Sequence, residues 1–193
     1  MATEIERKFL VINDHWRELA KSSARLTQGY LTEGGQRSVR VRTKAGGKAF
    51  LNIKSSVNGI SRSEYEYEIP YDDALEILEN IALKPFIDKT RYLVEIGNHT
   101  WEVDEFSGEN KGLVIAEVEL GSEDEAFQKP AWAGTEVSGE AAYYNMNIAS
   151  QKWRSCYPES LLLQFGGTVD PDNRFIESAS SSEYADMECK DGC

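Results

Sequence analysis

The chain of 193 residues contains only two histidines and three cysteines. All three cysteines (Cys156, Cys189 and Cys193) occur late, and neither His15 nor His99 lies at zinc-ligand spacing from them, so we expect no zinc site. Nothing in the sequence indicates a cysteine, serine or histidine nucleophile. An odd cysteine count without a regular framework favours a reducing compartment, and we therefore predict a cytoplasmic location.

The sequence also lacks a long apolar run and an excess of basic residues. No 18 consecutive residues are apolar, and the start, Met1-Ala2-Thr3-Glu4, resembles no secretory signal, so we expect no membrane partner. The net charge of -12 argues against nucleic-acid binding, which needs a basic face. A local cluster of basic residues could still bind a phosphorylated small molecule.

The character of the chain changes after Pro158. Half of the net negative charge lies from Glu159 onward, and Ser178–Ser182 is a serine-rich segment typical of a mobile tail. The apolar residues Leu161, Leu162, Leu163 and Phe165 could dock on the preceding domain or could be an incidental end.

Alternation of apolar and polar residues dominates the first two thirds of the sequence and predicts strands. We expect eight, at about 3–11, 25–33, 37–44, 48–55, 60–69, 86–97, 99–106 and 112–120. Helices are predicted over 14–22, from Asp72 to before Pro85, from Ser122, and over about 141–152. The expected class is mainly β with flanking helices.

Each predicted strand has one apolar face, and many have one strongly charged face. Two arrangements satisfy this pattern: a sandwich whose charged faces point to bulk water, or a closed antiparallel barrel with the charges inside and helices outside. Taken singly, an alternating charged strand is usually a solvated face.

The charges are nevertheless sorted into like pairs. Acidic pairs occur in the first, fifth, seventh and eighth strands, as in Glu4/Glu6 and Glu117/Glu119, whereas basic pairs such as Arg40/Arg42 occur mainly in the third, fourth and sixth. Two like charges about 4 Å apart repel by about 4 kcal/mol at an effective dielectric constant near 20. The sorting therefore favours a barrel whose lumen holds a divalent cation and a polyanion.

These residues resemble a known family. The opening Glu4-x-Glu6-x-Lys8, followed in order by Arg40-x-Arg42, Lys54, Arg62, Glu64-x-Glu66, Lys89-x-Arg91, Asp104 and Glu117-x-Glu119, is similar to the CYTH superfamily, or triphosphate tunnel metalloenzymes. The opening octapeptide from Glu4 to Val11, with Gln28-Gly29-Tyr30-Leu31 and Tyr143-Tyr144-Asn145, looks like its short bacterial-type inorganic triphosphatases. The resemblance covers residues 1–157 and leaves 158–193 as an acidic tail.

The resemblance implies a closed eight-stranded antiparallel β-barrel, a tunnel with a charged lumen, that hydrolyses inorganic triphosphate to pyrophosphate and phosphate. It implies Mg²⁺ or Mn²⁺ held by Glu4, Glu6, Glu117 and Glu119, helped by Asp104. The phosphates would be held by Lys8, Arg40, Arg42, Lys54, Arg62, Lys89 and Arg91. Lys8, Lys89, Glu64 and Glu66 are the candidate catalytic residues, and the two glutamates either orient the bases or position an attacking water.

Other readings stay open within and outside the family. The family includes class IV adenylate cyclases and thiamine triphosphatases, although no base-reading element is evident in this sequence. A module that binds polyphosphate without catalysis would keep the basic residues but could dispense with the paired acids. The sequence does not determine the oligomeric state, and a homodimer is one alternative.

Overall fold

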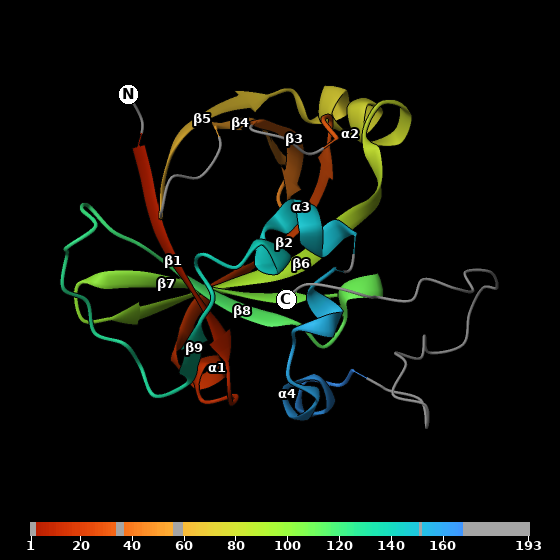
Figure 1. The fold of residues 1–193 in the computed structure, drawn as a ribbon. Coiled ribbons are helices and arrows are strands. Elements are labelled where there is room, and N and C mark those ends of the chain that lie inside the picture. Colours follow the sequence, from red (N-terminus) through yellow and green to blue (C-terminus); the bar gives the residue numbers. More distant parts are fainter. Residues whose placement is uncertain (1–2, 34–36, 56–59, 151, 168–193) are drawn as a thin grey trace.

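The computed structural model describes residues 3–33, 37–55, 60–150 and 152–167, and its eight main strands form a closed antiparallel ring (Figure 1). The ring runs β5-β4-β3-β2-β6-β7-β8-β1, and β1 pairs back to β5. The strands are β1 (Thr3–Val11), β2 (Ala20–Tyr30), β3 (Arg37–Lys44), β4 (Lys48–Ser55), β5 (Ser61–Ile69), β6 (Leu83–Ile96), β7 (His99–Phe106) and β8 (Val114–Glu119). The predicted barrel is therefore confirmed.

Two strands begin earlier than the alternation predicts. β2 starts at Ala20, because Ser22 and Ser23 pair with Leu93 and Tyr92 of the long strand β6. The helix predicted over 14–22 consequently shrinks to α1 (Trp16–Leu19). β6 starts at Leu83 instead of 86 and follows directly on α2 (Tyr71–Asn80).

A ninth strand, β9 (Ala133–Glu136), was not predicted, and it adds to β1 outside the ring. The helix predicted from Ser122 is absent, so this prediction was wrong. The segment before β9 is instead a loop whose aromatic residues Phe127 and Trp132 pack on the outer face of the barrel. The packing of these two aromatic side chains holds the loop against the barrel.

The outer apolar face of the barrel forms two clusters. One includes Trp16, Trp101 and Trp132 and lies beneath α1, β9 and the loop before it. The other joins β3 and β4 to α2, which lies over these strands in Figure 1. Gly29 of β2 allows this approach, because a Cβ there would come within 2.8 Å of Ala82 Cβ and 2.9 Å of Leu78 Cδ2.

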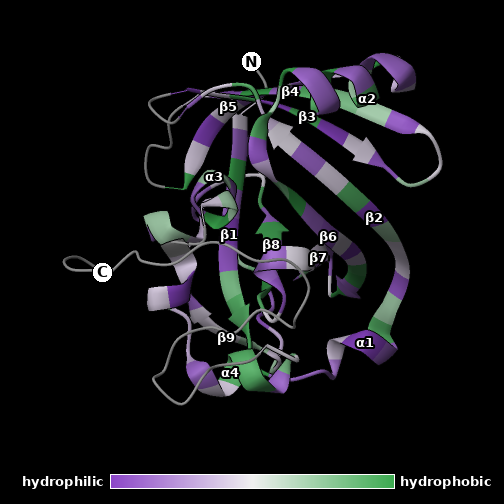
Figure 2. Ribbon diagram, turned by 90° about the vertical axis from the view of Figure 1, so that its right-hand side faces the viewer, coloured by the Kyte–Doolittle hydropathy of each residue, from purple (hydrophilic) through white to green (hydrophobic). Residues whose placement is uncertain are grey.

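Inside the barrel, the inward face changes from charged to apolar along single strands. In β1 the inward residues Glu4, Glu6 and Lys8 are followed by Leu10, because every second side chain shares a face. The hydropathy colours of Figure 2 show the hydrophobic end of this strand. Corresponding inward positions of the other strands, Tyr30, Ile87, Phe106 and Ile115, belong to the same apolar cluster as Leu10, together with Leu113 just before β8.

The segment after β9 fills this apolar end of the barrel. The helix predicted over 141–152 is divided into η2 (Ala141–Tyr143), α3 (Asn145–Ala149) and η3 (Lys152–Ser155), with Tyr144 extended between the first two. Tyr143, Ile148 and Trp153 are at most 1% exposed and pack on the inward-facing apolar residues. We call this packed segment, residues 137–150 and 152–162, the end plug.

Helix α4 (Glu159–Gln164) extends the end plug beyond Pro158. Leu161 and Leu162 are buried and Phe165 is partly buried against the core, so the docking alternative holds for this apolar patch. Residues 168–193, with the serine-rich segment, lie outside the described residues, and the mobile tail stays a prediction. Among the helices described, none is long and apolar enough to span a bilayer.

Candidate active site

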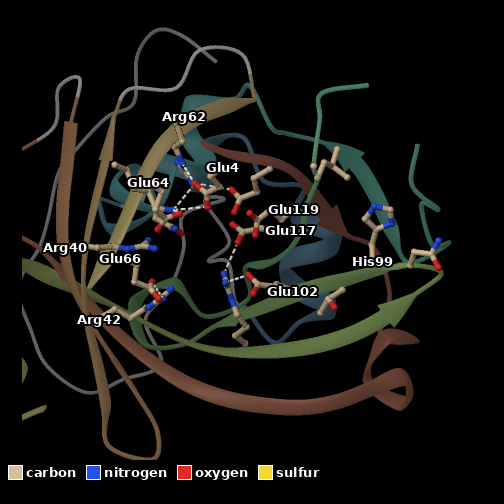
Figure 3. A pocket seen from close by; sticks show the side chains of 18 residues that line it. Glu4, Arg40, Arg42, Arg62, Glu64, Glu66, His99, Glu102, Glu117 and Glu119 are labelled. Carbon is tan, nitrogen blue, oxygen red and sulfur yellow. Dashed lines mark hydrogen bonds and ion pairs between the residues drawn. The ribbon is translucent and has the colours of Figure 1, made fainter. Parts of the chain in front are cut away.

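A cavity of about 730 Å³ opens into the charged half of the barrel (Figure 3). Twelve charged side chains from seven of the eight ring strands line it: Glu4, Glu6, Arg40, Arg42, Lys54, Arg62, Glu64, Glu66, Arg91, Glu102, Glu117 and Glu119. The period-two alternation of each strand turns these side chains inward. The sequence prediction that these charges share one lumen is therefore confirmed by their positions.

Three predicted site residues do not line this cavity. Lys8 borders a second, small cavity of about 20 Å³ that it shares with Glu6, Arg62, Ser138 and Tyr144. Lys89 and Asp104 are 1% and 0% exposed and lie deeper in the barrel interior, where Asp104 contacts Arg91 and the Lys89 ammonium lies over the Phe106 ring.

At the junction of β1, β4 and β5, Glu4 joins two cations. Lys54 Nζ lies 3.0 Å from Glu4 Oε1 and 2.9 Å from Glu64 Oε2, and Arg62 Nε lies 2.5 Å from Glu4 Oε2. Burial lowers the pKa of Lys54, and the nearby guanidinium of Arg40 lowers it further. The network keeps two cations at the cavity surface, where an anion can reach them.

Lys8 forms the centre of a second network. Its ammonium contacts the carboxylates of Glu6 and Glu117, and Glu117 Oε2 also lies 2.8 Å from Arg91 Nη2. Burial opposes the charge of Lys8, but the carboxylates of Glu117 and Glu6 outweigh it and raise the pKa of Lys8. Burial likewise opposes the charge of Glu117, yet Lys8 and Arg91 hold the pKa of this carboxylate well below its usual value.

Asp104 binds the two cations of β6. Arg91 donates from Nε to Asp104 Oδ1 at 2.7 Å and from Nη2 to Oδ2 at 2.5 Å, and Lys89 contacts the same carboxylate. Burial lowers the pKa of Lys89 to about 8, although Asp104 favours the charged form. Asp104 therefore links the side chains of Lys89 and Arg91.

Glu64 and Glu66 also contact their neighbours on the lumen wall. Asn52 donates to Glu64 Oε1 at 3.0 Å and to Glu66 Oε2 at 2.6 Å. Glu66 Oε2 lies 2.5 Å from Arg42 Nη2, and Glu64 pairs with Lys54. These contacts favour the alternative in which both glutamates orient basic residues.

The donors for a divalent metal are present, but the described residues contain no group of three acidic, histidine or cysteine side chains already arranged around an ion site. Glu119 has no Lys, Arg or His nitrogen within 4.0 Å in the described part of the chain, unlike Glu4, Glu6 and Glu117. Burial raises the pKa of Glu119, and so do the like charges of Glu4, Glu6 and Glu64. Crowded carboxylate oxygens of this kind fit a hard cation such as Mg²⁺ or Mn²⁺.

Some cavity residues were not predicted as site residues. Glu102 pairs with Arg91, and the alternation already places it on the same face as Asp104, which is the signal that could have found it. At the mouth, Asn98 comes from the β6–β7 turn and His99 and Thr100 from the start of β7, whereas Asn145 of α3 lines the cavity from the end plug. No local pattern marks them, because only the closed ring and the end plug bring them to the cavity.

A closed antiparallel β-barrel with a cavity of opposed acids and bases defines the class of this protein, and comparison with known proteins identifies the family. The CYTH domain model matches residues 2–147. The chain belongs to the CYTH family, and membership implies a divalent metal ion.

Two curated relatives are inorganic triphosphatases. That of Acetivibrio thermocellus is 48% identical over 155 residues, which cover 80% of this chain and 98% of the relative. That of Nitrosomonas europaea is 37% identical over 150 residues, covering 76% and 97%. A solved crystal structure of an inorganic triphosphatase is 33% identical with a TM-score of 0.55, and covers 77% of this chain and 95% of that one.

Proposed function

We propose that this protein hydrolyses inorganic triphosphate to pyrophosphate and phosphate with Mg²⁺ or Mn²⁺. The observation that carries the proposal is the convergence of eleven of the fourteen predicted acidic and basic site residues in one cavity. The two triphosphatase relatives, which match nearly their whole length to this chain, support it. The predicted cytoplasmic location is part of the proposal.

The basic residues of the lumen would bind the phosphates. They are Lys8, Arg40, Arg42, Lys54, Arg62, Lys89 and Arg91. Arginine offers paired N–H donors to phosphate oxygens, whereas lysine supplies a compact charge. Phosphoryl transfer depends mainly on alignment and charge neutralisation, which such a set provides.

The carboxylates Glu4, Glu6, Glu117 and Glu119 would hold the metal. When bound, the ion neutralises phosphate charge and lowers the pKa of an attacking water. Three of these four carboxylates are paired with lysine or arginine. A triphosphate would replace them at the cations and leave their oxygens available as ligands.

Three acidic residues would hold basic side chains in position. Asp104, which the resemblance assigns to the metal, would hold Lys89 and Arg91 in place through its contacts with both. Glu64 and Glu66 would orient Lys54 and Arg42.

Phosphate release tests the proposal. Purified full-length protein is incubated with sodium triphosphate and Mg²⁺, Mn²⁺ or EDTA, and with ATP and thiamine triphosphate in parallel. We expect release from triphosphate to exceed release from both other substrates and to stop in EDTA. Equal release in EDTA would overturn the metal role. Cyclic AMP from ATP would indicate a cyclase, and binding of triphosphate without turnover in Mn²⁺ would indicate a binding module.

A further inference from the structure

Three polar side chains on neighbouring strands have buried atoms without a protein partner. They are both amide atoms of Gln28 on β2, Nε of Arg40 on β3, and Oδ1 of Asn52 on β4. The residues are only 1%, 5% and 0% exposed. Unpaired buried polar groups of this kind are rare in folded proteins and call for an explanation, such as a bound ligand or water.

The strand register places the three side chains on one inward face. Arg40 is directly opposite Asn52, and Gln28 is directly opposite Arg42, two residues along β3 from Arg40. Directly opposed residues share a face, and diagonal neighbours on that face are within reach of long side chains. Arg40 and Arg42 line the main cavity, and Asn52 and Gln28 lie directly beside them on the same inward face.

Arg40 also differs from the other predicted phosphate-binding cations. Lys8, Arg42, Lys54, Arg62, Lys89 and Arg91 each have a carboxylate oxygen within ion-pair distance. In the described part of the chain no carboxylate lies within 4.0 Å of Arg40. A buried guanidinium without a counter-ion is a site for an anion.

Gln28 lies at the inner end of the charged lumen. Its cross-strand partner on β6 is Ile87, which belongs to the end plug's apolar cluster, and its partner on β3 is the cavity residue Arg42. A linear anion that enters from the mouth would therefore meet this group with its leading end.

We propose that Gln28, Arg40 and Asn52 form an inner subsite that receives the terminal phosphoryl group of triphosphate. The guanidinium and the Gln28 amide nitrogen donate to phosphoryl oxygens. The amide oxygens of Gln28 and Asn52 accept from the P–OH of a protonated terminal group or from a bridging water. The inference rests on the proposed function and deepens it, because it makes Gln28 a substrate-binding residue.

Gln28→Leu is the critical variant, because leucine is similar in size but cannot hydrogen-bond. We expect the KM for triphosphate to rise about tenfold, the loss expected for one hydrogen-bonding group to a charged ligand. The melting temperature of the ligand-free protein should stay equal or rise, since an unpaired buried amide is removed. The increase in melting temperature caused by triphosphate in EDTA should shrink.

Two further variants complete the test. Gln28→Glu adds a negative charge to the subsite and should raise KM more than Gln28→Leu does. Ser23→Ala, at an exposed position on the outer face of the same strand, should leave KM and melting temperature as in the unmodified protein. Asn52 is left intact, because its amide nitrogen also holds Glu64 and Glu66.

The outcomes separate this inference from the proposed function. If the unmodified protein releases no phosphate from triphosphate, the proposed function fails. If it is active and Gln28→Leu leaves KM unchanged, the inner subsite is wrong while the function stands. A fall in the melting temperature of Gln28→Leu without a change in KM would assign Gln28 a structural role and overturn the inference.

Discussion

Lys8 and Glu117 are directly opposite each other on β1 and β8, and their side chains form a buried ion pair. Each also has a second partner, Glu6 for Lys8 and Arg91 for Glu117. This chain of contacts joins a proposed metal-binding acid to two proposed phosphate-binding bases. A change at either end of the pair should therefore alter catalysis.

Glu117→Gln should lower turnover about 100-fold, the scale on which metal-site residues act, because it removes a charged oxygen ligand. Phosphate release from triphosphate in Mn²⁺ measures the effect, and circular dichroism confirms that the barrel is still folded. Glu123→Gln, on the exposed loop after β8, is the matched control and should keep full turnover. Unchanged turnover in Glu117→Gln would refute the assignment of Glu117.

Asp104→Asn should destabilise the fold by about 3 kcal/mol, because it leaves Lys89 and Arg91 buried without their shared carboxylate. Urea unfolding measures the loss. The double variant Asp104→Asn/Lys89→Met removes one of the two buried cations left without a carboxylate and should recover part of the stability. A double variant no more stable than Asp104→Asn would contradict the ion-pair account.

Glu136→Gln should lower the free energy of unfolding by up to about 1 kcal/mol at neutral pH, as expected for a part-exposed pair. The side-chain hydrogen bond from Arg7 is the main cause that holds the pKa of Glu136 below its usual value. A depressed folded pKa gives stability that is present above the unfolded pKa and is lost as pH falls through the folded one. The free energies of unfolding of the unmodified protein and of Glu136→Gln should therefore become equal in acid. A difference in stability that persists in acid would contradict this prediction.

Leu162→Ala should destabilise the protein by about 2–5 kcal/mol, the range for a buried leucine that leaves a cavity. Leu162 is fully buried in the end plug, whereas its neighbour Leu163 is 52% exposed. Leu163→Ala should change stability by less than about 0.5 kcal/mol. Thermal unfolding of the two variants compares the positions, and equal effects would show that α4 does not dock in solution.

The alternation of charged and apolar residues was enough to predict the ring, because each ring strand is six or more residues long and period two is then unambiguous. It also predicted an inward position for Glu4, Arg40 and Glu117. The helix predicted over 141–152 falls in the end plug, but its division into η2, α3 and η3 and its packing inside the barrel were not predicted, because these pieces are too short to show helical periodicity. Gln28 belongs to the Gln28-Gly29-Tyr30-Leu31 segment of the family resemblance, but its unpaired amide is evident only in three dimensions.

The barrel closes through a short contact. Among the described residues, β1 and β5 pair from Thr3 to Ile5 and from Ser61 to Ser63, and within that stretch Arg62 pairs with Glu4. This seam has three described residue pairs, against five or more at each other joint of the ring, so local opening should start there. The Arg62–Glu4 pair, whose members would contact the substrate and the metal, also holds β1 against β5. Ligand binding and the closure of the barrel are thereby linked.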